Sequence, residues 1–154
     1  MSDQHHHFME ICLAESRKAL DEGSVPVGSV IVRDGSVIGV GRNTVASTID
    51  PTAHAEIVAL RDACRNVGSI DLAGATLYTA MEPCPMCGWA IKAANIDRLV
   101  MGARHAGLKR TDYGDYSIEL LLKMTRQTLD IVTGIRVPEC EAMRRSWPGH
   151  VHRA

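Results

Sequence analysis

The sequence has no long apolar run, few aromatic side chains and no strong net charge, and each absence excludes something. No run approaches the roughly 20 apolar residues that a membrane-spanning helix needs. The formal net charge is −1 over 154 residues, so no global field favours a nucleic-acid partner. One Phe, two Trp and three Tyr leave few rings on which bases could stack. A hydrophobic content of 45% still allows a substantial core, and the length predicts a single domain over residues 1–154.

The N-terminus and the cysteines predict a cytoplasmic protein. Residues 1–10, MSDQHHHFME, have neither the basic n-region nor the apolar h-region of a secretory signal. We expect the histidines at positions 5–7 to belong to a frayed polar start. Five cysteines, an odd number without an export signal, argue against a disulfide framework. Free, buried or metal-bound cysteines fit better.

Hydrophobic periodicity predicts helices that alternate with strands. Two apolar runs within residues 25–43 flank Asp34 and Gly35, a pair typical of a β-hairpin turn. Helices are predicted over residues 8–22, 54–67, 83–94, 117–125 and 138–146, and strands over 75–81, 98–103 and 128–135. This alternation predicts an α/β fold in which helices cover both faces of a sheet.

Cys84 and Cys87 stand at the start of a predicted helix, three residues apart, so both sulfurs lie on one face. Pro85 suits the first helical turn, where a missing N–H costs nothing. The positive end of the helix dipole favours thiolates, the form that binds metal. A redox pair and two buried structural cysteines are the alternatives.

His54 begins the helix that follows the hairpin and is the third candidate ligand. A helix-cap or core histidine is the ordinary interpretation of such a residue. However, helix N-termini gather at the carboxyl ends of strands in α/β sheets, which would bring His54 to Cys84 and Cys87. One His and two Cys favour zinc, and three protein ligands without a fourth are typical of a catalytic site that keeps a position for water.

Glu56 lies in the same helical turn as His54 and could reach a water beside the metal without binding the metal. The alternative is a glutamate that stabilises the helix N-terminus. Glu82, which precedes Pro83, is interpreted as a support for the loop and not as a second acid.

The sequence HAE at 54–56, followed by PCPMC at 83–87, matches the H-x-E…P-C-x-x-C signature of zinc deaminases. With VPVGSVIV at 25–32, GRN at 41–43 and RLVMGAR at 98–104, the chain resembles the cytidine deaminase-like superfamily, in its branch of cytosine, guanine and tRNA adenosine deaminases. The resemblance implies a three-layer α-β-α fold with a mixed five-stranded sheet between helices. It also implies one Zn²⁺ per subunit and a homodimer.

Residue roles carried over from this resemblance make His54, Cys84 and Cys87 the zinc ligands and Glu56 the catalytic proton shuttle. Asn43 matches the substrate-binding asparagine of the family; a turn residue is the alternative. The segment RTDYGDYS, residues 110–117, lies where such families place a loop over the substrate. The candidate substrate-binding residues of this loop and the C-terminal tail are Asp112, Tyr113, Asp115, Tyr116 and Trp147. A solvated acidic loop is the alternative for 110–117.

Three functions remain open at this point. The sequence favours deamination of a free nucleobase or related heterocycle, of the cytosine or guanine type. The alternative is a tRNA-specific adenosine deaminase, which needs a basic surface. Residues 104–154 carry 9 Lys and Arg against 6 Asp and Glu, whereas residues 1–103 carry 8 against 12. The basic character that would indicate an RNA partner is therefore weak. A zinc-stabilised binding module without catalysis would need a fourth ligand.

Overall fold

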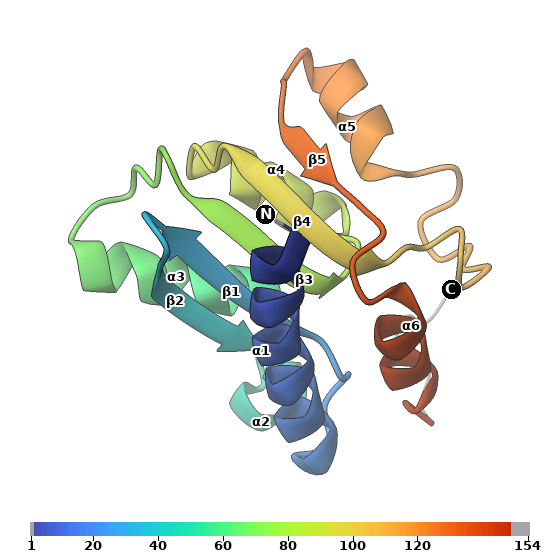
Figure 1. Ribbon diagram of the computed structural model, residues 1–154. Helices are drawn as coiled ribbons and strands as arrows, with labels where there is room; N and C mark the ends of the chain where they lie inside the picture. Colours follow the sequence, from blue (N-terminus) through green and yellow to red (C-terminus); the bar gives the residue numbers. More distant parts are fainter. Residues whose placement is uncertain (1, 149–154) are drawn as a thin grey trace.

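A mixed five-stranded sheet forms the centre of the computed structural model, which describes residues 2–148 (Figure 1). In chain order the elements are α1 (Ser2–Asp21), β1 (Gly28–Arg33), β2 (Ser36–Arg42), α2 (Val45–Thr48), α3 (Ala55–Val67), β3 (Thr76–Met81), α4 (Pro85–Ala93), β4 (Arg98–Ala103), α5 (Ile118–Thr125), β5 (Asp130–Val132) and α6 (Val137–Arg145). The strand order is β2-β1-β3-β4-β5. Strand β1 is antiparallel to both neighbours, whereas β3, β4 and β5 are parallel. The predicted mixed sheet is confirmed.

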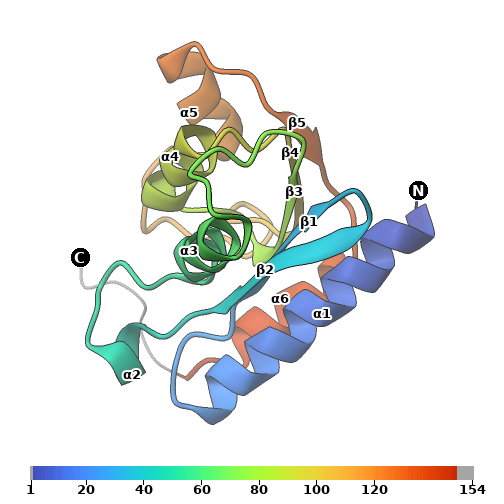
Figure 2. The ribbon, with the colours of Figure 1, turned by 90° about the vertical axis from the view of Figure 1, so that its left-hand side faces the viewer.

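Helices cover both faces of this sheet, as Figure 2 shows with α1 and α6 on one side and α3, α4 and α5 on the other. Alternate side chains of a strand point to opposite faces, and β3 serves both layers. Tyr78 packs in the core beneath α1 with Phe8 and Met9. Leu77 packs in the second core with Leu60 of α3 and Ile91 of α4. The three-layer arrangement is confirmed.

The hairpin turn and the end of α3 follow the predicted local chemistry. Asp34 and Gly35 have φ angles of 51° and 76°, the left-handed values that a two-residue turn between twisted strands requires. Helix α3 ends at Gly68, whose φ is 69° and whose N–H donates to the Cys64 carbonyl. The hairpin therefore places β2 beside β1, and α3 returns along the face of both.

The expectation of a frayed N-terminus is wrong. Helix α1 already begins at Ser2, and the His5 side chain is 8% exposed with Nδ1 2.9 Å from the Tyr78 hydroxyl oxygen. His5 and Phe8 are one helical turn apart and both pack against Tyr78, so the sheet holds the first turns of the helix. Helix α1 has 20 residues but is not apolar enough to cross a membrane. No other described helix is long and apolar enough either.

Two smaller differences concern short elements. Helix α2, four residues long, was not predicted, because one turn leaves no hydrophobic period to detect. Strand β5 spans only Asp130–Val132 where a strand over 128–135 was predicted. Its role as the parallel edge strand beside β4 is nevertheless confirmed.

Gly41 lets α3 approach β2 backbone to backbone. A Cβ at this position would lie 2.4 Å from both the Ala55 carbonyl oxygen and the Ala59 nitrogen. We therefore expect Gly41→Ala to lower the free energy of unfolding by about 1–3 kcal/mol, measured by urea denaturation. Gly107→Ala is the control, since its Cβ would meet mainly the flexible end of the Glu141 side chain. Equal stability of the two variants would contradict the close approach.

Candidate metal centre and active site

One edge of the sheet collects the candidate residues. Because β1 is antiparallel to both β2 and β3, the strands β2, β3 and β4 all end at the same edge, where sites form in α/β sheets. Asn43 follows β2, Cys84 follows β3, and His105 follows β4. His54 and Cys84 are the N-cap residues of α3 and α4, so two helix N-termini meet here.

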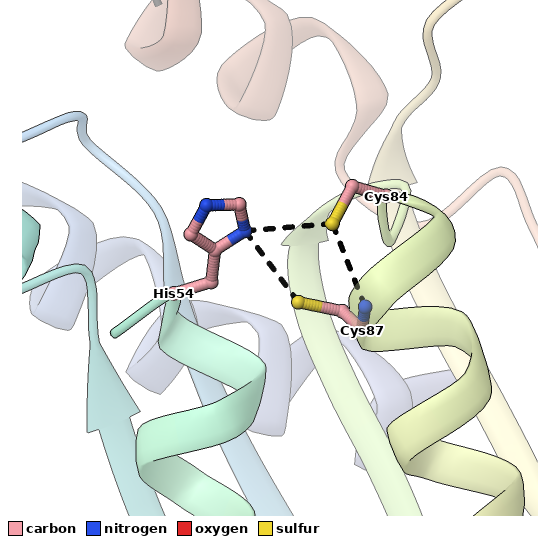
Figure 3. A group of neighbouring side chains, drawn as sticks. All are labelled: His54, Cys84 and Cys87. Carbon is pink, nitrogen blue, oxygen red and sulfur yellow. Dashed lines mark hydrogen bonds between the residues drawn. The ribbon is translucent and has the colours of Figure 1, made fainter. Parts of the chain in front are cut away.

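His54, Cys84 and Cys87 form a compact group of metal-binding atoms. The His54 Nδ1 atom lies 3.5 Å from the Cys84 sulfur and 3.5 Å from the Cys87 sulfur (Figure 3). Tetrahedral zinc, with bonds of about 2.3 Å to sulfur and about 2.0 Å to nitrogen, would separate such atoms by about 3.5 Å. All three ligand atoms lie within 4.8 Å of one another. The donor types and their spacing therefore fit zinc.

The surroundings of Cys84 favour its thiolate. Hydrogen bonds from the Cys87 thiol, from His54 and from the Cys87 backbone N–H lower the pKa of Cys84 to about 4. The same contact with Cys84 raises the pKa of His54. Donation of its proton to Cys84, together with burial, raises the pKa of the Cys87 thiol. A bound cation would draw that proton off as well, since thiols that bind metal are deprotonated.

Glu56 lies beside this group without belonging to it. Its side chain is 4% exposed and lines the same pocket as His54 and Cys84. The Thr79 hydroxyl of β3 donates to Glu56 Oε1 at 3.1 Å. This hydrogen bond fixes the carboxyl group of Glu56 relative to the sheet. Burial, and then the negative charge of Cys84, raise the pKa of Glu56. A carboxyl group with a raised pKa can both accept and return a proton near neutral pH.

The pocket next to the metal group takes in some of the predicted substrate-binding residues and not others. Its lining comprises Val25, Val27, Asn43, His54, Ala55, Glu56, Met81, Glu82, Cys84, His105, Arg110, Tyr113 and Arg144. Asn43 and Tyr113 therefore line this pocket, and their role in substrate binding stays a prediction. Asn43 is also tied to the following loop, because its Oδ1 accepts the Val45 N–H at 3.1 Å.

Asp112, Asp115 and Trp147 are absent from the described lining of that pocket. Asp112 forms an ion pair with Arg110, and Asp115 is exposed. Trp147 is partly buried but lies elsewhere. The rest of the C-terminal tail, residues 149–154, lies outside the described residues.

Glu82 organises the loop after β4. Its carboxylate is 3% exposed and accepts hydrogen bonds from the Arg104 side chain and from the backbone N–H groups of His105 and Ile118. One buried carboxylate thus joins the end of β3, the end of β4 and the start of α5. The interpretation of Glu82 as a support for the loop is confirmed.

Among the lining residues without a predicted role are three basic ones: His105, Arg110 and Arg144. His105 could have been found, because it follows the carboxyl end of β4 much as Cys84 follows that of β3. Arg110 begins the segment 110–117 but was not singled out there, and Arg144 was visible only as part of a mild basic bias. Their convergence on one pocket depends on the loop and on α6, which no local pattern predicts.

Fold and metal group together define a zinc-binding deaminase of the α-β-α type. The chain belongs to the family described as the cytidine and deoxycytidylate deaminase zinc-binding region, whose model matches residues 2–103. The predicted superfamily and the zinc cofactor are thereby confirmed.

Within this family the chain is similar to two kinds of deaminase. It is 37% identical over 139 residues to a protein of Buchnera aphidicola named tRNA-specific adenosine deaminase, covering 90% of each chain. A solved structure described as a study of A-to-I editing by tRNA:A34 deaminases matches with a TM-score of 0.79 and 37% identity, over 89% of this chain and 98% of that one. A guanine deaminase of Bacillus subtilis is 43% identical over 90 residues, which is 58% of each chain.

The preference for a free cytosine- or guanine-type base is wrong on this comparison. In sequence the guanine deaminase aligns over 58% of each chain, whereas the tRNA-specific relative aligns over 90% of each. The solved guanine deaminase of Bacillus subtilis matches over 93% of this chain, but at 30% identity and a TM-score of 0.65 it is less similar than the tRNA:A34 deaminase. The preference rested on the small net charge, the weak basic bias of residues 104–154 and the scarcity of aromatic rings. In the structure the loop at 110–117 brings Arg110 to the pocket and pairs Asp112 with it, so the acidic residues of the loop do not act alone.

Proposed function

We propose that the protein is a hydrolytic deaminase that converts adenosine to inosine in tRNA. The observation that carries the proposal is the near full-length likeness to a tRNA-specific adenosine deaminase, supported by the likeness to the solved tRNA:A34 deaminase. The metal group and Glu56 supply the chemistry, and two arginines supply a surface that suits RNA. Formation of a homodimer stays a prediction from the resemblance.

In the proposed mechanism His54, Cys84 and Cys87 hold the zinc ion. When bound, zinc supplies Lewis-acid activation of the attacking water. Glu56 takes a proton from that water and passes it to N1 of adenine, while the water oxygen forms a bond to C6. Glu56 then moves the second proton to the exocyclic amine, the C6–N bond breaks, and ammonia leaves. Adenosine and water thus give inosine and ammonia.

Asn43 and Tyr113, which line the pocket with Glu56, are the substrate-binding residues of this proposal. Asn43 is 6% exposed and already held by its bond from Val45. Its orientation is therefore set before substrate arrives, which lowers the entropy cost of binding.

Arg110 and Arg144 bring two cations to the pocket, and Arg110 forms an ion pair with Asp112. Burial together with the charge of Arg110 lowers the pKa of Arg144 to about 10. Arg144 has no ion pair with any residue in the described range. A phosphate of the RNA backbone would relieve the repulsion between the two cations.

An RNA panel tests the proposal. The zinc-loaded protein would be incubated with two anticodon stem-loops. The first carries adenosine at the first anticodon position, and the second carries its only loop adenosine at another position. Free cytosine, guanine and adenine would be tested in parallel. We expect inosine in the first RNA and much less in the second. Ammonia from a free base, with no inosine in either RNA, would contradict the proposal.

A further inference from the structure

Thr79 lies on β3, on the face of the sheet that α3 covers. Alternate side chains of a strand share a face, and Leu77, two residues earlier, packs in the core with Leu60 of α3. The Thr79 side chain is fully buried and is absent from the described lining of the active-site pocket. Any part that Thr79 plays in the reaction must therefore pass through a neighbouring side chain.

The neighbouring side chain is Glu56 of α3. The Thr79 hydroxyl oxygen lies 3.1 Å from Glu56 Oε1 and 3.2 Å from the Met81 carbonyl oxygen. A hydroxyl has one proton to donate, and a hydrogen bond to an ionised carboxylate is roughly twice as strong as one to a neutral carbonyl. The ionised Glu56 is therefore the preferred acceptor.

The sheet makes Thr79 a rigid support for that carboxylate. Strand β3 is hydrogen-bonded on both sides, and Thr79 is paired with Ser29 of β1 and Met101 of β4. A β-branched side chain is also stiff about its first torsion, whereas the glutamate side chain is unbranched and loses considerable rotamer freedom when it is held. The hydrogen bond from Thr79 therefore restricts Glu56 more than it restricts Thr79.

The other hydrogen bonds of the Glu56 carboxyl group cannot anchor it in the same way. Within the described residues they come from its own backbone N–H and from the Cys87 thiol. The first belongs to Glu56 itself and does not tie it to the sheet. The second is lost when the Cys87 sulfur binds zinc, because a coordinating thiol is deprotonated. Among the described residues, Thr79 is thus the donor from outside α3 that remains in the zinc-loaded protein.

We propose that Thr79 is a positioning residue for deamination, whose hydroxyl holds Glu56 Oε1 and leaves Oε2 to take the proton from water and pass it to the base. The inference rests on the proposed function, because it requires Glu56 as the proton-transfer group. Such a group must lie within hydrogen-bond reach of the proton that it moves. Loss of the Thr79 hydroxyl should therefore slow the chemical step and leave the affinity for RNA unchanged.

Replacements at position 79 separate the hydroxyl from the shape of the side chain. Thr79→Val keeps the branched shape without the hydroxyl, Thr79→Ser keeps the hydroxyl, and Thr79→Ala is a second variant without it should valine pack poorly. We expect valine and alanine to lower kcat on the anticodon stem-loop by at least about 10-fold, with KM and zinc content unchanged. Serine should retain most of the wild-type kcat. Wild-type kcat in both variants without the hydroxyl, or an equal loss in Thr79→Ser, would overturn the proposal.

Thr76→Val is the matched control for the loss of a threonine hydroxyl from this strand. Thr76 begins β3 and is only partly buried, and it too is absent from the described lining of the pocket. It should keep the wild-type kcat. An equal loss of kcat in Thr76→Val and Thr79→Val would mean that threonine supports the strand and not Glu56, and would also overturn the proposal.

Crystal structures of the zinc-loaded variants test the anchoring without reference to activity. We expect one orientation of the Glu56 carboxyl group in the wild type and in Thr79→Ser, with Oε1 at the hydroxyl of residue 79. In Thr79→Val and Thr79→Ala the carboxyl group should be displaced or occupy more than one orientation. An unchanged single orientation in both of these variants would contradict the proposal.

Failure of the proposed function would be seen separately. If the wild type forms no inosine in RNA, the same variants would be compared on whichever free base the wild type deaminates, and the crystal structures would still be decisive for the anchoring. A lower kcat in Thr79→Val that Thr79→Ser does not share would support the positioning role on that base. Unchanged kcat in Thr79→Val and Thr79→Ala would refute it.

Discussion

Glu56→Gln is expected to abolish deamination while leaving zinc bound. The amide has nearly the shape of the carboxyl group but cannot take a proton from water and return it. General acid–base groups contribute about 10²- to 10⁴-fold to rate, and Glu56 acts at more than one step, so the loss should lie at the upper end. Single-turnover formation of inosine from the anticodon stem-loop measures it.

The zinc content separates this loss from damage to the metal group. Glu56 is not a member of the metal-binding group, so Glu56→Gln should carry as much zinc as the wild type. Glu22→Gln is the matched control, because Glu22 is an exposed carboxylate paired with Arg42, and it should edit normally. Substantial activity in Glu56→Gln would remove Glu56 from the mechanism.

Cys87→Ser is expected to lose zinc and with it the activity. Serine has the wrong donor atom and a shorter reach, and it would leave only His54 and Cys84 from the group. Mutation of a residue that only hydrogen-bonds to a metal ligand lowers metal affinity by about 10- to 100-fold. Removal of a ligand itself should therefore lower the zinc affinity by more than about 100-fold. Competition with a chromogenic chelator measures the affinity, and metal analysis gives the content.

Cys64→Ser is the control for the loss of a thiol. Cys64 is partly buried near the end of α3 and is not part of the metal group. It should retain both zinc and editing. Equal zinc affinity in Cys64→Ser and Cys87→Ser would mean that the group around His54 does not hold the metal.

The metal group could be predicted from the sequence because local rules place its members. The spacing of Cys84 and Cys87 puts both sulfurs at one helix start, and the ends of parallel strands meet at one edge of the sheet. The hairpin at Asp34 and the strands flanking it follow equally from local turn chemistry. These features need no knowledge of distant contacts.

The pocket wall and the substrate could not be predicted in the same way. The placement of the His105 ring depends on Glu82 and on the two tyrosines that pack against it. Arg144 reaches the pocket from α6, far along the chain, so a sum of charges could not reveal it. The burial of His5 likewise depends on Tyr78 in the sheet.

Editing in water enriched in heavy oxygen tests the central claim most directly. The zinc-loaded wild type would act on a tRNA with adenosine at the first anticodon position, and the nucleosides would be analysed by mass spectrometry. The proposed hydrolysis predicts inosine at that position with the heavy isotope at C6, and none in Glu56→Gln. Adenosine that remains intact, while a free base releases ammonia under the same conditions, would contradict the account.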